Sequence, residues 1–210
     1  MEKEFWLQRW QEQQIGFHEG RFNSSLLNHW PHLQAPHSGS VFVPLCGKSQ
    51  DLVFFAENGM TVVGIELSHI AVDAFFHEQG LTPQRSQYGE LQCYRAGPYT
   101  LFCGDLFALD TEPLKDCHWV YDRAALIALP ETMRRDYCQH LARILPRPCR
   151  NLTITLEYDQ SLKAGPPFSI DPSMLAELCN DLADLVLLGE RPEEVKGITA
   201  VEYSMVLNYR

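Results

Sequence analysis

The stretch Val41-Phe42-Val43-Pro44-Leu45-Cys46-Gly47-Lys48-Ser49, with its continuation to Glu66, decides the fold. Residues 41–45 are apolar and rich in β-branched side chains, which predicts a short buried strand. Residues 50–58 have helical periodicity, and residues 61–66 form a second apolar run that ends on the acid. A strand, a tight turn, a helix and a strand ending on an acid are typical of a nucleotide-binding site.

The rest of the chain continues this alternation of strands and helices. We expect Ser24, Ser49 and Ser68 to cap helices and residues 81–90 to form a loop. Further helices are expected at 3–15, 24–30, 69–79, 131–145 and 172–182, and further strands at 91–94, 99–103, 118–121, 152–158, 183–189 and 199–207. The pattern predicts a single α/β domain over residues 1–210, with a mostly parallel sheet covered on both faces and the last two strands paired antiparallel at one edge.

Composition excludes several classes of function. The chain has 210 residues, a net charge of -10 and 45% hydrophobic residues, so it can bury a core. Without concentrated basic charge, neither nucleic acid nor an anionic membrane surface is an expected partner, whereas a cationic ligand is tolerated. No apolar run approaches the roughly 18 residues of a membrane span, and the N-terminus lacks an apolar signal region, so we expect a cytoplasmic protein.

Metal and disulfide sites are not expected. The seven cysteines are odd in number and no pair has the Cys-x-x-Cys spacing, so we expect reduced thiols that mostly fill the core. His29, His32 and His37 cluster near a linker, but Pro31 interrupts their helix and no cysteine or acid completes a ligand set.

Candidate site residues follow four of the predicted strands. In an open parallel sheet, ligands bind beyond the carboxyl ends of the strands. The turns 44–48, 66–68, 103–107 and 122–124 carry Gly47, Glu66, Asp105 and the pair Asp122 and Arg123. Glu66 comes 19 residues after Gly47, close to the spacing at which an acid binds the ribose hydroxyls of a nucleotide.

Three cofactors compete for this layout. A dinucleotide would require Gly-x-Gly-x-x-Gly, and the turn has a single glycine. Gly47-Lys48-Ser49 matches the end of a phosphate-binding loop, but its first glycine would stand at Phe42. S-adenosylmethionine has no phosphates, needs the ribose acid, and carries a sulfonium cation that suits an acidic chain and aromatic faces such as Trp10 or Phe17. It fits best.

Several motifs together resemble the thiopurine S-methyltransferase family, in its bacterial branch. The resemblance runs from about residue 5 to the C-terminus and rests on Phe42-Val-Pro-Leu-Cys-Gly-Lys48, Val62-Val-Gly-Ile-Glu66, Asp122-Arg-Ala-Ala-Leu126, Gly165-Pro-Pro-Phe168, and Trp6, Trp10 and Phe17-His18. It implies the Rossmann-like, seven-stranded fold of S-adenosylmethionine-dependent methyltransferases, with residues 1–38 as an N-terminal helical lid. It also implies a monomer.

The resemblance assigns roles to individual residues. It places S-adenosylmethionine against Trp10, Leu45, Glu66 and Arg123, with Asp105 and Leu106 flanking the adenine, and it places Trp6 and Phe17 where the lid closes over cofactor and acceptor. The family often has Asp-Arg-Gly where this chain has Asp122-Arg123-Ala124. We expect Ala124 to adopt ordinary dihedral angles there.

The implied reaction is methylation of thiopurines and other aromatic or heterocyclic thiols, with selenium and tellurium detoxification as a further family role. We interpret Arg123 as the catalytic cation that faces the acceptor and favours its thiolate; an ion pair with Asp122 or a neighbouring acid is the structural alternative. Cys46 is interpreted as packing. The alternative functions are a cofactor-binding regulator without turnover and a phosphotransferase that uses Lys48.

Overall fold

The computed structural model describes residues 3–16, 18–35 and 38–210. It confirms the strand–helix–strand unit predicted at the start: β1 (Gly39–Pro44), α3 (Asp51–Glu57) and β2 (Met60–Glu66). β1 and β2 pair in parallel from Gly39 opposite Met60 to Pro44 opposite Ile65. The two strands therefore end side by side, and the turns that follow them meet at one edge of the sheet.

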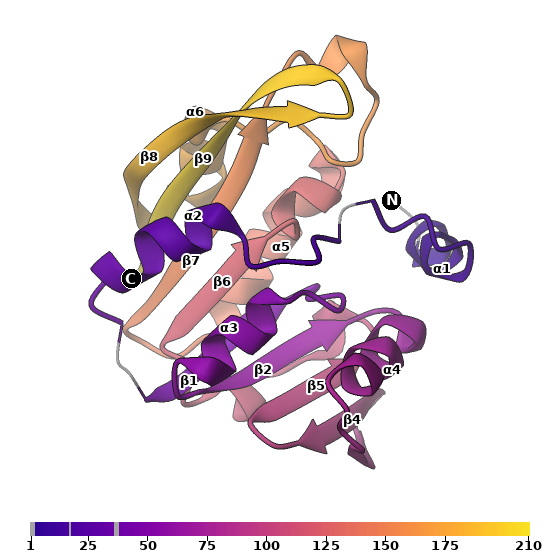
Figure 1. Ribbon diagram of the computed structural model, residues 1–210. Helices are drawn as coiled ribbons and strands as arrows, with labels where there is room; N and C mark the ends of the chain where they lie inside the picture. Colours follow the sequence, from indigo (N-terminus) through magenta and orange to yellow (C-terminus); the bar gives the residue numbers. More distant parts are fainter. Residues whose placement is uncertain (1–2, 17, 36–37) are drawn as a thin grey trace.

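The sheet has nine strands in the described residues, in the order β3-β4-β5-β2-β1-β6-β7-β9-β8 (Figure 1). The strands not yet placed are β3 (Gln84–Tyr88), β4 (Leu91–Ala96), β5 (Tyr99–Cys103), β6 (Trp119–Arg123), β7 (Cys149–Glu157), β8 (Ala183–Val195) and β9 (Ile198–Tyr209). The five central strands, β5, β2, β1, β6 and β7, are parallel. Antiparallel pairs flank them at both edges, so the predicted pair β8–β9 is confirmed.

Two sequence expectations about the sheet are wrong. The family resemblance implied seven strands, and the loop expected from the sequence at 81–90 contains the strand β3, which extends the sheet beyond β4. The residues of β3 are polar, and all but Tyr88 are exposed. A strand that buries no face has no apolar alternation to reveal it, because its ladder hydrogen bonds come from the backbone alone.

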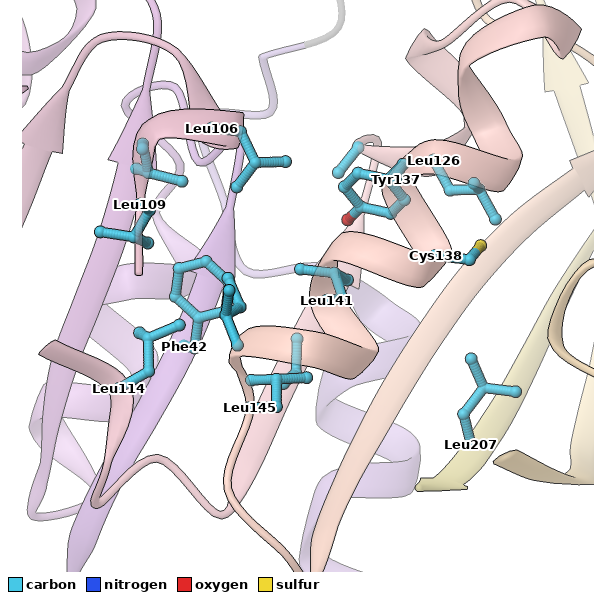
Figure 2. Close-up of a cluster of buried hydrophobic side chains, with 14 of the residues drawn as sticks. Phe42, Leu106, Leu109, Leu114, Leu126, Tyr137, Cys138, Leu141, Leu145 and Leu207 are labelled. Carbon is cyan, nitrogen blue, oxygen red and sulfur yellow. The ribbon is translucent and has the colours of Figure 1, made fainter. Parts of the chain in front are cut away.

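Helices cover both faces of the sheet and divide the core in two. The remaining helices are α1 (Lys3–Gln11), α2 (Ser24–His29), α4 (His69–Glu78), α5 (Glu131–Ile144) and α6 (Pro172–Cys179), with short 3-10 turns at η1 (Trp30–His32), η2 (Leu106–Ala108), η3 (Glu112–Leu114), η4 (Leu126–Ala128) and η5 (Gln160–Leu162). Val41 and Val43 pack with α2, α3 and α4, whereas Phe42 between them packs with α5. Figure 2 shows Phe42, Leu106 and Leu141 in the second of these clusters.

The helix starts differ in detail from the expected caps. Asn23, not Ser24, caps α2, because its side-chain oxygen accepts from the backbone N–H of Ser25 and Leu26. α3 begins at Asp51, whose N–H donates to Ser49 Oγ at 3.1 Å. Ser68 is the N-cap residue of α4, but its hydroxyl makes no capping bond.

Gly64 allows the turn after β1 to approach β2. A Cβ at this position would lie 2.7 Å from Leu101 Cδ2 and 2.8 Å from Cys46 Sγ, so only a glycine leaves room for both side chains. The glycine in the middle of an apolar strand thus positions the turn that carries Gly47.

The N-terminal helix α1 lies apart from the sheet, on the side toward which the arrow of β2 points (Figure 1). It contacts α4. No helix within the described ranges is long and apolar enough to cross a membrane.

Candidate active site

The carboxylate of Glu66 joins the turns that follow β1 and β2. Its Oε2 accepts from Gly47 N–H at 2.9 Å, and its Oε1 accepts from Ser68 N–H at 2.9 Å. The side chain is only 6% exposed. Burial raises the pKa of Glu66, while the hydrogen bonds from the amides of Ser68, Gly47 and Leu67 counteract that rise. Each oxygen retains a further lone pair, so the carboxylate can still accept from a ligand hydroxyl.

The turn between β1 and α3 is sharp. Leu45 has φ 45° and Gly47 has φ 54°, both in the left-handed region. For a bulky residue such as Leu45 this conformation is an outlier that costs energy, and such residues concentrate at functional sites. The consequence here is that Cys46 N–H donates to Ile65 O at 3.0 Å and the next N–H, of Gly47, is directed at Glu66.

Trp10 of α1 packs directly over this turn. The indole is 5% exposed, and a Cβ added at Gly47 would lie 3.3 Å from its Cζ2 atom. Trp6, one turn earlier on the helix, is half-buried and packs edge-to-face with Phe5, with ring centroids 5.3 Å apart. Phe17 lies outside the described residues, so its expected role and that of Trp6 toward the acceptor stay predictions.

Lys48 is engaged in an ion pair. Its Nζ lies 2.6 Å from Glu78 Oε1 of α4, and the lysine side chain is 15% exposed. A phosphate at this turn would therefore meet a neutralised lysine and the buried carboxylate of Glu66 in place of a set of free N–H donors. The geometry removes the phosphate-binding interpretation of Gly47-Lys48-Ser49.

Asp105 and Leu106 stand at the turn after β5. Asp105 caps η2 by accepting from Phe107 N–H at 3.0 Å, and its other oxygen pairs with Lys3 of α1 at 2.7 Å. The Leu106 side chain is 5% exposed and belongs to the core cluster of Figure 2, while its carbonyl oxygen bonds His140 Nε2 at 2.9 Å. Their expected contact with adenine stays a prediction.

Arg123, at the end of β6, pairs with Glu19 of the segment that links α1 to α2. Burial alone would lower the pKa of Arg123, but Tyr121, Glu19 and Asp51 together raise it, so the guanidinium is firmly charged. The structural alternative for Arg123 was an ion pair with Asp122 or a neighbouring acid, and the acid that pairs with it is Glu19. Asp122 instead accepts from the Tyr137 hydroxyl at 2.7 Å and from Leu126 N–H at 3.2 Å.

The expectation for Ala124 is wrong. Its φ is 59°, in the left-handed region that favours glycine, so the alanine is strained in the turn directly after Arg123. The glycine that often stands here in the family would adopt this conformation without that cost.

Two features of the site were missed by sequence reasoning. Asp51 is 1% exposed and holds the linking segment down: its Oδ1 accepts from Asn23 N–H at 2.8 Å and its Oδ2 from the Tyr121 hydroxyl at 3.0 Å. Ser68 Oγ is fully buried beside Glu66 and has no hydrogen-bond partner within the described part of the chain. A buried hydroxyl without a partner is costly, so Ser68 Oγ is a polar atom beside Glu66 whose hydrogen-bonding capacity is unmet.

The cysteines and histidines offer no competing chemistry in the described residues. Cys46 is buried, and burial raises the pKa of its thiol well above the ordinary value, so it is a poor nucleophile and fills the core. No group of three or more His, Cys, Asp or Glu side chains in the described ranges could hold a metal ion. His37 lies outside those ranges.

Comparison with solved structures identifies the fold. The chain superimposes with a TM-score of 0.69 on a Burkholderia thailandensis 1,6-didemethyltoxoflavin-N1-methyltransferase with bound S-adenosylhomocysteine, over 99% of this chain and 87% of that one, at 14% identity. The fold is that of the α/β S-adenosylmethionine-dependent methyltransferases, as predicted.

Comparison of sequences identifies the family. The family model of thiopurine S-methyltransferase matches residues 1–201. A thiopurine S-methyltransferase of Pseudomonas putida (strain F1) is 52% identical over 204 residues, covering 97% of this chain and 91% of that protein. One from Xanthomonas campestris pv. campestris (strain 8004) is 46% identical over 210 residues, covering 96% and 95%. The chain belongs to the thiopurine S-methyltransferase family, and the resemblance predicted from its motifs is confirmed.

The strain at Ala124 predicts that Ala124→Gly stabilises the protein. Relief of the left-handed strain outweighs the added freedom of the unfolded chain, for a net gain of about 0.5–1 kcal/mol and a rise of about 1–4 °C in Tm. Thermal unfolding measures this. The matched control is Ala125→Gly, since Ala125 has φ -89° and glycine there should lower Tm. A fall in Tm for Ala124→Gly would contradict the account.

We predict that the buried carboxyl group of Asp122 makes the free energy of unfolding depend on pH. Burial raises the pKa of its carboxyl to about 6, so the folded state binds a proton that the unfolded state releases between its ordinary pKa of 3.8 and that value. The contribution of Asp122 to the free energy of unfolding is fully present below pH 3.8 and is lost as the pH rises through about 6.

Asp122→Asn removes this titration. The free energy of unfolding of the variant, relative to wild type, should therefore rise by about 2 kcal/mol between about pH 4 and pH 7. Urea titrations at a series of pH values measure the difference. A difference that is constant with pH would show that Asp122 is ionised in the folded state throughout.

Proposed function

We propose that this chain transfers the methyl group of S-adenosylmethionine to the sulfur of thiopurines and other aromatic or heterocyclic thiols. The observation that carries the proposal is the buried carboxylate of Glu66, held against the single-glycine turn at Gly47. An acid in this position suits the ribose of a nucleoside and disfavours a phosphate. Membership of the thiopurine S-methyltransferase family supplies the acceptor class.

The described residues fit the cofactor. Glu66 would accept from the ribose hydroxyls. Leu45 shapes the turn, Trp10 covers it, and Asp105 and Leu106 border the neighbouring turn after β5. When bound, S-adenosylmethionine supplies a methyl group activated by its sulfonium charge.

Few side chains need to act on the acceptor. Methyl transfer to a thiolate is a single in-line displacement, so the protein contributes mainly by holding the two reactants in register, which supplies up to roughly 7–11 kcal/mol in well-oriented cases. Arg123 is the proposed catalytic cation, because its charge favours the thiolate form and its five N–H donors can serve two partners. The residues 1–38, with Trp6 and Phe17, would exclude water. All these groups come from one chain, so a monomer suffices.

The direct test is transfer of a tritiated methyl group from labelled S-adenosylmethionine to 6-mercaptopurine. We expect transfer by the wild-type chain. In Glu66→Gln we expect the affinity for S-adenosylhomocysteine to fall by roughly tenfold or more, since the amide cannot accept from both ribose hydroxyls as a carboxylate does.

Controls separate binding from folding in this test. Glu66 bonds two backbone amides, so each variant is first compared with wild type by thermal unfolding and circular dichroism. A folded wild-type chain that binds S-adenosylhomocysteine but methylates no thiol would contradict the enzyme and favour the alternative of a cofactor-binding regulator. Selenite and tellurite are included as acceptors in the same assay, because metalloid methylation is part of the family resemblance.

A further inference from the structure

We propose that Glu19 recognises the amino-acid end of S-adenosylmethionine, acting together with Arg123. The inference rests on the proposed cofactor and adds a residue that the motifs did not single out. The methionyl end of the cofactor is a zwitterion, with one ammonium and one carboxylate. Glu19 and Arg123 are an opposite pair of charges that can receive it, the carboxylate of Glu19 toward the ammonium and the guanidinium of Arg123 toward the carboxylate.

The position of the pair supports this role. Arg123 ends β6, which lies next to β1 in the sheet, so the pair stands beside the turn of Leu45 to Lys48. His18 lies close enough to Lys48 and Arg123 that their charges lower the pKa of its imidazole, after the larger effect of burial. The adenosine end of the ligand is assigned to Glu66 at the end of β2, so the two ends of the cofactor fall on β2 and β6, the strands on either side of β1.

The side chains of Arg123 and Glu19 differ in their exposure to solvent. The Arg123 side chain is 13% exposed and that of Glu19 is 38% exposed, so the arginine is fixed in the protein while the glutamate stands at the solvent side. Asp51 accepts from Tyr121 and Asn23, which ties β6 to the linking segment, and its charge is near enough to Arg123 to raise the pKa of the guanidinium. Arg123 therefore does not depend on Glu19 alone for charge balance, and Glu19 can exchange its partner for an ammonium.

The proposed role also explains why the segment that links α1 to α2 carries the charged residue Glu19. Aromatic residues alone would cover the turn, as Trp10 does. A carboxylate at Glu19 adds a negative charge that can recognise a cation.

The test compares two ligands that differ only at this end of the molecule. S-adenosylhomocysteine carries the zwitterion, and 5′-methylthioadenosine keeps the adenosine and the sulfur but lacks it. Calorimetry measures both affinities for wild type and for Glu19→Gln, which preserves size and can still accept from Arg123. We expect a loss of roughly tenfold or more for S-adenosylhomocysteine and less than about twofold for 5′-methylthioadenosine.

Two further variants define the interpretation. Glu78→Gln is the matched control, because Glu78 is also 38% exposed and pairs with a similarly buried cation, Lys48 at 15%. It removes one negative charge near the same turn, and we expect it to change both affinities by less than about twofold. Glu19→Asp keeps the charge on a shorter side chain, and we expect a smaller loss for S-adenosylhomocysteine than with Glu19→Gln.

Several outcomes would overturn the inference. An equal loss of both ligands in Glu19→Gln would assign Glu19 to closure of the segment. No loss of either, or an equal loss of S-adenosylhomocysteine in Glu78→Gln, would exclude a specific contact. A wild-type chain that binds neither ligand would contradict the proposed cofactor itself and the inference with it, whereas binding without thiol methylation would leave the inference standing and contradict only the acceptor.

Discussion

The site depends on one interaction, the acceptance of two backbone N–H groups by the buried carboxylate of Glu66. It joins the turn after β1 to the turn after β2 and fixes the direction of Gly47 N–H. In phosphate-binding turns of related layout, such N–H groups face the ligand. Here a negative charge already accepts that donor, and Lys48 is neutralised by Glu78. Under the proposed function, the same glycine turn that elsewhere binds phosphate would become the floor of a site for an uncharged ribose.

The N-terminal segment depends on the same edge of the sheet. Three of its residues contact the turns of three different strands: Lys3 pairs with Asp105 after β5, Trp10 packs on Gly47 after β1, and Glu19 pairs with Arg123 at the end of β6. Each contact lies at the carboxyl end of a parallel strand, where ligands of this fold bind. The ion pair of Lys3 with Asp105 is mostly exposed, so it is individually weak and screened by solvent. That suits the proposed lid, which would have to open for cofactor and acceptor to enter.

The sequence predicted the elements whose signals are local. Apolar runs indicated the central strands. Gly47 and Glu66, which are 19 residues apart in sequence, are joined by a direct hydrogen bond. Residues without a local signal were missed. The strand β3 buries no apolar face, so it has no apolar alternation. Glu19 contacts Arg123 only because the tertiary fold brings two distant segments together. The strain of Ala124 arises from a positive φ, which the identity of an alanine does not indicate. Family resemblance named most of the candidate site, but it gave no partner for Arg123.

We propose that Glu66 makes this a nucleoside site that excludes phosphate. Competitive calorimetry on the wild-type chain tests this proposal, with S-adenosylhomocysteine and with ATP in the presence of Mg²⁺ as the two ligands. We expect that S-adenosylhomocysteine binds and that ATP neither binds nor displaces it. Binding of ATP in competition with S-adenosylhomocysteine, or binding of ATP alone, would contradict it.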